Sequence, residues 1–262
     1  MNLREEKEMI FDTHAHYDDS VFDEDRDELL RGMAGNGIGT IVNIGASIKT
    51  SAATVALTER YPFLYGAVGV HPSETNALSE RDMEQLLSDC AHPKIVAVGE
   101  IGLDYHYPDT NRELQQRWFV RQLELAREVR LPVVIHSRDA ANDTMQIMKE
   151  QHCEEIGGVV HCFSYSKELA LQYVEMGFYI GVGGVITFSN AKKLVEAVKA
   201  IPLERIVLET DAPYLSPAPE RGSRNHSGKL WLVAEKLADL KDVTVQELIR
   251  ITEENARRLY RI

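Results

Sequence analysis

Short apolar runs and longer amphipathic stretches alternate along the whole chain. Eight runs rich in Val and Ile predict strands at about residues 9–16, 39–45, 64–71, 94–101, 132–137, 157–163, 178–183 and 205–211. Two of them, 133–135 and 206–208, are continuously apolar, which is typical of parallel strands buried on both faces. The pattern therefore predicts repeated βα units.

The stretches between the strands predict helices with recognisable ends. A long amphipathic helix is expected over 111–129, and another over 166–176 ends at Gly177, a residue that favours helix C-termini. Thr244 and Glu247 form a capping-box pattern that opens a helix through Ile251. A separate last helix, about 253–260, is expected to seal the bottom or side of the fold.

The spacing of the strand ends indicates the architecture. They follow one another about one βα unit apart, and eight such units build a closed (β/α)8 TIM barrel. We therefore expect a single domain over residues 1–262. An open doubly wound sheet is the alternative, and it is weaker because no glycine-rich phosphate loop follows the first strand.

Composition and charge bear on the cellular location of the protein and on the molecules that it can bind. No apolar run is long enough to span a bilayer, and the charged residues 1–8 do not resemble a signal peptide. Three cysteines without CxxC spacing fit a reducing, cytoplasmic location; Cys162 is expected to be a small buried side chain facing away from His161. The net charge of −12 argues against tight non-specific binding to duplex nucleic acid.

Potential metal ligands lie at the ends of the predicted strands. His14 and His16 end the first strand and point the same way, because alternate side chains of a strand share a face. Four more end the fourth, fifth, sixth and eighth strands: Glu100, His136, His161 and Asp211. In a barrel these strand ends open on one face, so all six residues converge there.

Four imidazoles and two carboxylates are too many for one tetrahedral site with an open position. They suit two divalent ions that share a carboxylate, an arrangement used in phosphoester hydrolysis, where one ion activates water and the other stabilises the phosphoryl and leaving oxygens. Asp12, two residues before His14, either supports this centre from behind or fills the barrel interior. His92 and His152 fall at helix-to-strand turns on the opposite face, where surface roles are expected.

The motifs around these residues resemble those of the TatD-family metal-dependent deoxyribonucleases, within the wider amidohydrolase-like barrels. They are FDTHAH at 11–16, GVHP at 69–72, GEIGLD at 99–104, IHSRDA at 135–140, HCF at 161–163 and LETDAPYL at 208–215. The similarity continues through Arg221, Arg224 and Asn225 to NARRL at 255–259. One departure is His226-Ser227-Gly228, where many members carry an acidic residue and proline, and this puts the substrate preference in doubt.

The resemblance implies how the ligands are divided. His14, His16 and Asp211 would hold one ion, His136 and His161 the other, and Glu100 would bridge the two. Mg²⁺ or Mn²⁺ is expected, with Zn²⁺ as an alternative, because mixed His and carboxylate sites accept all three. Asp211 is the candidate to orient water and take its proton, or it serves as a ligand alone.

Other residues are candidates for contacts with substrate. Arg138 shares a strand face with His136 and either pairs with phosphate or forms a structural ion pair. His71 points into the same mouth, for substrate or for packing. Arg221 and Arg224 either track a nucleic-acid backbone or pin their loop, and Tyr105 either stacks on a base or packs in its loop.

The sequence thus predicts a hydrolase of DNA phosphodiester bonds acting on single strands or ends; family members are described as 3′–5′ exonucleases. The alternatives are a metal-dependent hydrolase of another ester or amide, such as an aminoacyl-tRNA deacylase or a small-molecule amidohydrolase, and a non-catalytic metal-binding partner protein. No membrane association and no obligate protein partner is implied.

Overall fold

Eight parallel strands, each paired with the next in chain order, form the centre of the computed structural model, which describes residues 8–262. The expectation for the charged start falls on residues 1–7, which lie outside this part. The strands are β1 (Ile10–Ala15), β2 (Ile38–Ile44), β3 (Leu64–Val68), β4 (Ile95–Asp104), β5 (Val133–Arg138), β6 (Gly158–Val160), β7 (Tyr179–Val182) and β8 (Ile206–Leu208).

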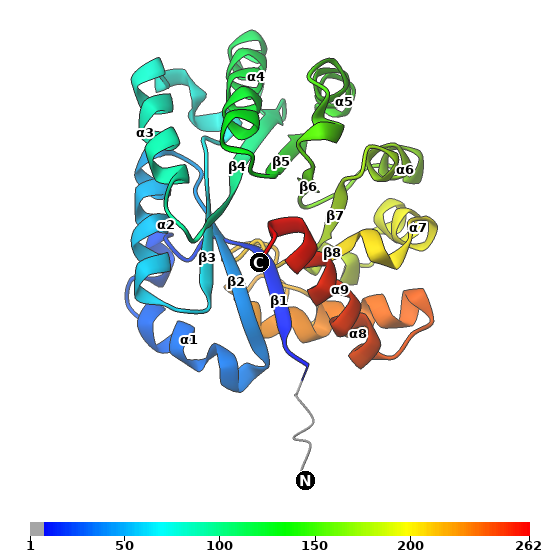
Figure 1. The fold of residues 1–262 in the computed structure, drawn as a ribbon. Helices are drawn as coiled ribbons and strands as arrows, with labels where there is room; N and C mark the ends of the chain where they lie inside the picture. Colours follow the sequence, from blue (N-terminus) through cyan, green and yellow to red (C-terminus); the bar gives the residue numbers. More distant parts are fainter. Residues whose placement is uncertain (1–7) are drawn as a thin grey trace.

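Helices surround the strands in chain order (Figure 1). They are α1 (Arg26–Gly32), α2 (Ile48–Arg60), α3 (Glu80–Cys90), α4 (Arg112–Val129), α5 (Ala141–Glu150), α6 (Lys167–Glu175), α7 (Lys192–Ala200), α8 (Leu230–Lys241) and α9 (Val245–Tyr260). Short 3₁₀ helices lie in the connections, among them η3 (Pro72–Ala77) and η5 (Gly184–Thr187). Within residues 8–262, none of these helices has the length and apolarity needed to cross a membrane.

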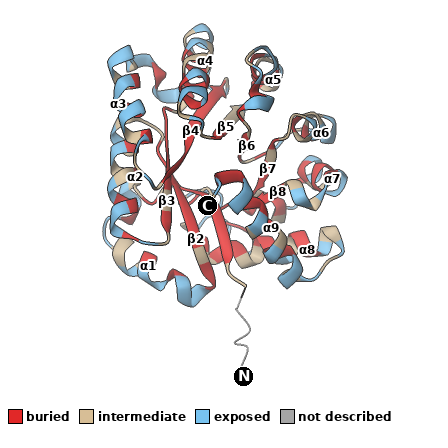
Figure 2. Cartoon of the chain, viewed as in Figure 1, coloured by how far each residue is buried: buried red, intermediate tan, exposed pale blue. Residues whose placement is uncertain are grey.

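The ring of strands closes between β8 and β1. Ala15 and Ala212 form a parallel bridge, and the His16 N–H donates to the Ala212 carbonyl at 2.7 Å. The strands are buried on both faces, whereas the helices expose only their outer sides (Figure 2). The predicted single-domain (β/α)8 barrel is therefore confirmed.

One end of the barrel is closed by α9. The Tyr260 ring stacks on Phe11 with centroids 6.1 Å apart, and its hydroxyl donates to the Thr13 carbonyl at 2.8 Å. Ala256 and Leu259 join the same apolar cluster at the base of the strands. The other end, where the strands terminate, is left open for the site.

The sequence predicted two separate helices at the end of the chain, but the structure has a single helix there, α9. The expectation of a separate last helix was therefore wrong. Thr252 lies in the middle of this helix. Its hydroxyl donates hydrogen bonds to the Leu248 and Ile249 carbonyls, so this polar group is paired within α9. Leu248, Thr252 and Leu259 are all buried, so one face of the helix continues unbroken. The Thr244 side chain accepts from the Glu247 N–H at 3.1 Å, as the capping pattern predicts.

Several strand ends also differ from the expectation. β4 runs on to Asp104, while β6 and β8 stop at Val160 and Leu208. Cys162 therefore lies beyond its strand with φ +45°, and its partly exposed side chain lines the open cavity. The expectation that Cys162 faces away was wrong, because strand alternation does not extend past the last strand residue.

Candidate metal centre

A cavity of about 1060 Å³ opens at the end of the barrel where the strands terminate. The structure brings all six potential ligands together there: five line the cavity, and His14 lies beneath them with no exposed surface. Three groups of ligand atoms lie close enough to share an ion: His14, His16 and Asp211; His14, Glu100 and His161; and His71, Glu100 and His136.

The atoms of the first ligand set are spaced as metal ligands are. His14 Nε2 lies 3.1 Å from His16 Nε2, 3.5 Å from Glu100 Oε2 and 3.7 Å from Asp211 Oδ1. His16 Nε2 lies 3.7 Å from the same Glu100 oxygen and 3.4 Å from the same Asp211 oxygen. Ligand bonds of about 2.1 Å place tetrahedral ligands roughly 3.4 Å apart, so the atoms of His14, His16 and Asp211 are spaced to share one divalent ion, and Glu100 Oε2 lies near both histidines.

The second oxygen of Glu100 faces a different set of nitrogens. Glu100 Oε1 lies 2.7 Å from His136 Nδ1 and 2.8 Å from His161 Nε2, and these two nitrogens are 3.4 Å apart. His71 Nε2 lies 3.8 Å from the same oxygen. One carboxylate thus presents one oxygen to each of two ligand sets, which is the arrangement of a bridging ligand.

The imidazole rings of His16 and His136 are oriented by contacts on the side away from the other potential ligands. His16 Nδ1 lies 2.8 Å from the Ile44 carbonyl, so this nitrogen carries the proton and Nε2 is left free for the centre. His136 Nε2 lies 3.3 Å from Asp104 Oδ2, in the same kind of carboxylate–imidazole contact. Asp104 belongs to a quoted motif, but sequence reasoning gave it no role.

Asp12 supports the site without entering it. The carboxylate is fully buried and accepts hydrogen bonds from the His14 N–H, from Thr210 and from Ser227. Burial raises the pKa of Asp12 to about 6. These contacts fasten the end of β8 to β1, so they fix Asp211 relative to His14.

The charges of the site set the protonation of its histidines. Burial opposes a charge on His161, but the neighbouring Glu100 carboxylate raises its pKa to about 10. In the same way, Asp211 and Glu100 outweigh burial and raise the pKa of His16 to about 9. Burial lowers the pKa of His14 to about 3, with the charge of His161 adding to the effect. Without metal, protons thus occupy positions that cations would take.

A buried acid behind the second ligand set was also missed. Glu209 Oε1 lies 3.8 Å from His161 Nδ1 and accepts from the Cys162 N–H at 2.5 Å. Burial raises the pKa of Glu209 to about 7. Its position two residues before Asp211 was visible in the sequence, but the strand pattern could not show that β8 ends at Leu208 and turns this side chain toward His161.

The residues proposed for substrate contacts fall into two groups. His71 and Arg138 line the cavity, and burial lowers the pKa of His71 to about 4. Arg221, Arg224 and Tyr105 are not among the described residues that line it. The substrate-binding roles of all five residues, and the assignment of ligands to two metal ions, stay predictions.

The three outlying side chains are engaged elsewhere. Arg224 pairs with Asp25 through two hydrogen bonds, and the guanidinium of Arg221 lies 4.4 Å from the centre of the Phe188 ring. The Tyr105 hydroxyl donates to Asp143 at 2.9 Å. The aromatic side chains that do line the cavity are Tyr107 and Tyr214, which sequence reasoning did not select.

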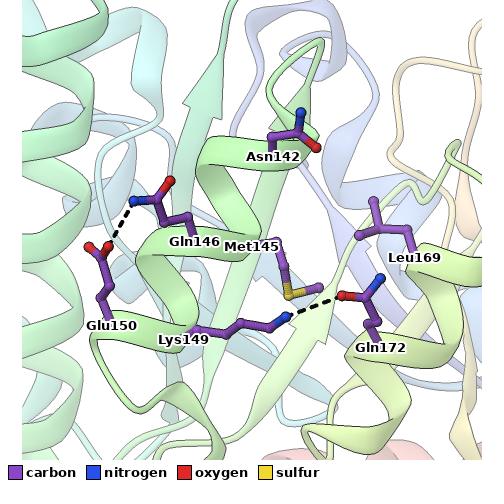
Figure 3. A pocket seen from close by; sticks show the side chains of 7 residues that line it. All are labelled: Asn142, Met145, Gln146, Lys149, Glu150, Leu169 and Gln172. Atoms are coloured by element: carbon purple, nitrogen blue, oxygen red, sulfur yellow. Dashed lines mark hydrogen bonds between the residues drawn. The ribbon is translucent and has the colours of Figure 1, made fainter.

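A second hollow lies on the outside of the barrel, between α5 and α6 (Figure 3). Four of its polar side chains are hydrogen-bonded in pairs: Gln146 donates to Glu150 at 2.8 Å, and Lys149 donates to Gln172 at 3.2 Å. The residues that line it include no histidine, so the cavity at the strand ends is the candidate site.

Comparisons with known proteins agree with this geometry. Residues 11–261 match the family model described as TatD related DNase. The chain is 42% identical, over 97% of its length and all of the other protein, to the uncharacterized metal-dependent hydrolase YabD of Bacillus subtilis (strain 168).

Solved structures give the same result. The crystal structure of YJJV, a TatD homolog from Escherichia coli K12, matches with a TM-score of 0.92 and 34% identity over 97% of this chain and 98% of that one. A TatD-family hydrolase from Entamoeba histolytica matches with a TM-score of 0.88 and 26% identity, over 97% of this chain and 98% of that one. The chain is a metal-dependent hydrolase and belongs to the TatD-related DNase family.

Proposed function

We propose that this hydrolase cleaves phosphodiester bonds of DNA, in single strands or at ends, at a centre of two divalent ions. The observation that supports it most strongly is the Glu100 carboxylate, which presents Oε2 to His14 and His16 and Oε1 to His136 and His161. Paired ions that share a ligand are a recurrent feature of phosphoester hydrolysis.

The ligand sets divide as the family resemblance implies. His14, His16 and Asp211 would hold one ion, His136 and His161 the other, and Glu100 both. Such ions lower the pKa of water and stabilise charge on the phosphoryl and leaving oxygens. Burial would raise the pKa of Asp211, but the hydrogen bond from His16 keeps it below the ordinary value, so the carboxylate is ionised at neutral pH, as a ligand or a proton acceptor must be.

The charge of the cavity also favours a cation-dependent reaction on an anion. Six acidic side chains line it, and they outnumber the cationic ones, which are Lys49, Arg138 and the protonated rings of His16 and His161. A phosphodiester would be repelled by this lining until bound cations reverse the local charge. Mg²⁺ or Mn²⁺ is our expectation and Zn²⁺ the alternative; the 3′–5′ direction and a cytoplasmic location likewise stay predictions.

The test is cleavage of end-labelled single-stranded DNA with Mg²⁺ or Mn²⁺, with and without chelator. Glu100→Gln keeps the shape of the side chain and removes its charge, and we expect at least about a 100-fold loss of rate because one change weakens both ion sites. Glu74→Gln is the matched control, since Glu74 lines the same cavity outside both ligand sets.

Chelator-insensitive cleavage, or an undiminished Glu100→Gln, would contradict the proposal. Aminoacyl-tRNA and amide substrates are assayed in parallel. Turnover of one of these without turnover of DNA would assign the same centre to another bond.

A further inference from the structure

Exposed aromatic side chains gather at the mouth of the metal centre. Among the described residues six large apolar side chains are exposed, and three of them line the cavity: Tyr107, Tyr214 and Leu215. Tyr107 is 59% exposed and Tyr214 is 54% exposed. Large rings left in water beside a catalytic centre gain by covering a ligand, since aromatic faces contribute both apolar area and stacking geometry.

The two tyrosines lie on opposite sides of the mouth. Tyr107 follows β4 and Tyr214 follows β8. In a ring of eight strands paired in chain order, strands four positions apart face each other across the barrel. The Tyr214 ring centre is 6.4 Å from that of the ligand residue His16, so this platform adjoins the first ligand set.

The backbone and hydroxyl of Tyr214 hold its ring in place. Its N–H donates to the Asp211 carbonyl at 2.8 Å, and its carbonyl accepts from Asn225 Nδ2 at 2.8 Å. The hydroxyl donates to Asp19 at 3.0 Å. The ring thus keeps its position without the face-to-face packing that would cover it.

Tyr107 is held by its neighbour. The His106 ring meets it edge-on with centroids 5.2 Å apart. His106 is itself fixed, because its Nδ1 lies 3.0 Å from Asp139 and its N–H donates to Asp104 Oδ1 at 2.9 Å. The same Asp104 also contacts the ligand residue His136, so this platform is connected to the second ligand set.

Tyr105, which the sequence offered for base stacking, is occupied. The Arg112 guanidinium lies 4.4 Å from the centre of its ring, and its hydroxyl contacts Gln116 and Asp143. With one face of its ring covered and its hydroxyl engaged, Tyr105 is not among the described residues that line the cavity.

We propose that Tyr107 and Tyr214 are stacking platforms for two unpaired bases, one on each side of the phosphate held at the metal centre. The inference rests on the proposed function and specifies its substrate: a single strand with a base on both sides of the cleaved bond. Stacking on an aromatic ring tolerates every base, so cleavage is sequence-independent. A base in a duplex must first leave its stack, so single strands are preferred.

Four variants test the proposal: Tyr107→Ala, Tyr214→Ala, and the corresponding changes to Phe. Each Ala change should raise KM for single-stranded DNA by about 5- to 140-fold, the range expected from 1–3 kcal/mol per stacked base at about 1.4 kcal/mol per tenfold. The Phe changes should recover most of the affinity, since they keep the ring. Leu87→Ala, an exposed apolar residue on α3, is the control away from the cavity.

The substrates separate stacking from a general structural effect. On an oligonucleotide with abasic positions beside the cleaved bond the Ala variants should lose much less, and their preference for single strands over duplex should shrink. An equal loss on normal and abasic strands, or no loss on either, would overturn the proposal.

Binding of fluorescent single-stranded DNA, measured by anisotropy in the presence of metal, distinguishes failure of the stacking platforms from failure of the proposed function. If wild type binds DNA without cleaving it and the Ala variants bind more weakly, the platforms hold and the proposed function fails. Binding that is insensitive to both rings, or no binding by wild type, overturns the platforms.

Discussion

Glu100→Gln is the perturbation whose effect can be worked furthest from the structure. The carboxylate lies within 3.8 Å of a ring nitrogen of five histidines, from 2.7 Å for His136 to 3.8 Å for His71. Burial would raise its pKa, but the charge of His161 and the hydrogen bond from His136 hold it well below the ordinary value, so Glu100 is ionised at neutral pH. The amide keeps the volume and removes the charge and one of the two acceptor oxygens.

The expected magnitude follows from metal linkage. Changes behind a ligand cost about 10- to 100-fold in metal affinity, so loss of a shared ligand should cost at least about 100-fold. At a metal concentration about 1,000 times the wild-type Kd, binding stabilises the fold by about 4.1 kcal/mol, and a 100-fold weaker site retains about 1.4 kcal/mol. The difference corresponds to roughly 5–11 °C in Tm for each weakened site in a chain of this size.

The assay is thermal unfolding with metal and with chelator, comparing the metal-dependent increase in Tm between variants. This difference removes any change that the substitution makes to the metal-free protein. Glu74→Gln should keep the wild-type increase. An unreduced increase in Glu100→Gln would refute the assignment of Glu100 as a shared ligand.

Three further predictions concern proton release on metal binding, a glycine in β4 and the closed end of the barrel. Because the pKa values of His16 and His161 are raised to about 9 and 10, both rings are protonated at pH 7.5 in the metal-free protein. Metal binding should therefore release protons, and the apparent affinity for metal should rise with pH. Titration calorimetry in buffers of different ionisation enthalpy checks this. Gly102→Ala should cost more than about 2 kcal/mol in denaturant unfolding, because φ is +141° and the new Cβ would lie 2.0 Å from the His136 carbonyl oxygen; Gly222→Ala, also at positive φ but in open space, should cost less. Tyr260→Phe should cost about 1 kcal/mol of stability, since it loses the bond to Thr13 at the closed end, and calorimetry should find its metal affinity unchanged.

The hydrophobic pattern was sufficient to predict the barrel. Parallel strands buried on both faces, as in 133–135, give continuous apolar runs that single-sequence reasoning detects. Because the ends of such strands share one face, the convergence of His14, Glu100 and Asp211 could also be predicted, although they are up to 197 positions apart.

Details beyond the strand ends could not be predicted, because they depend on contacts between distant residues. Arg224 is held by Asp25, 199 positions earlier, and nothing near Arg224 in the sequence signals that pairing. In the run 105–107, alternation does not decide which tyrosine faces the cavity, since β4 ends at Asp104 and the side chains that follow are placed by Arg112 and His106.

The most direct test of the two-ion centre is a titration of metal-free enzyme with Mn²⁺, in which bound metal and cleavage of single-stranded DNA are followed together. The account predicts two ions per chain at saturation, with cleavage reaching its maximum only as the second site fills. Full cleavage with one ion bound, or cleavage with none, would contradict it.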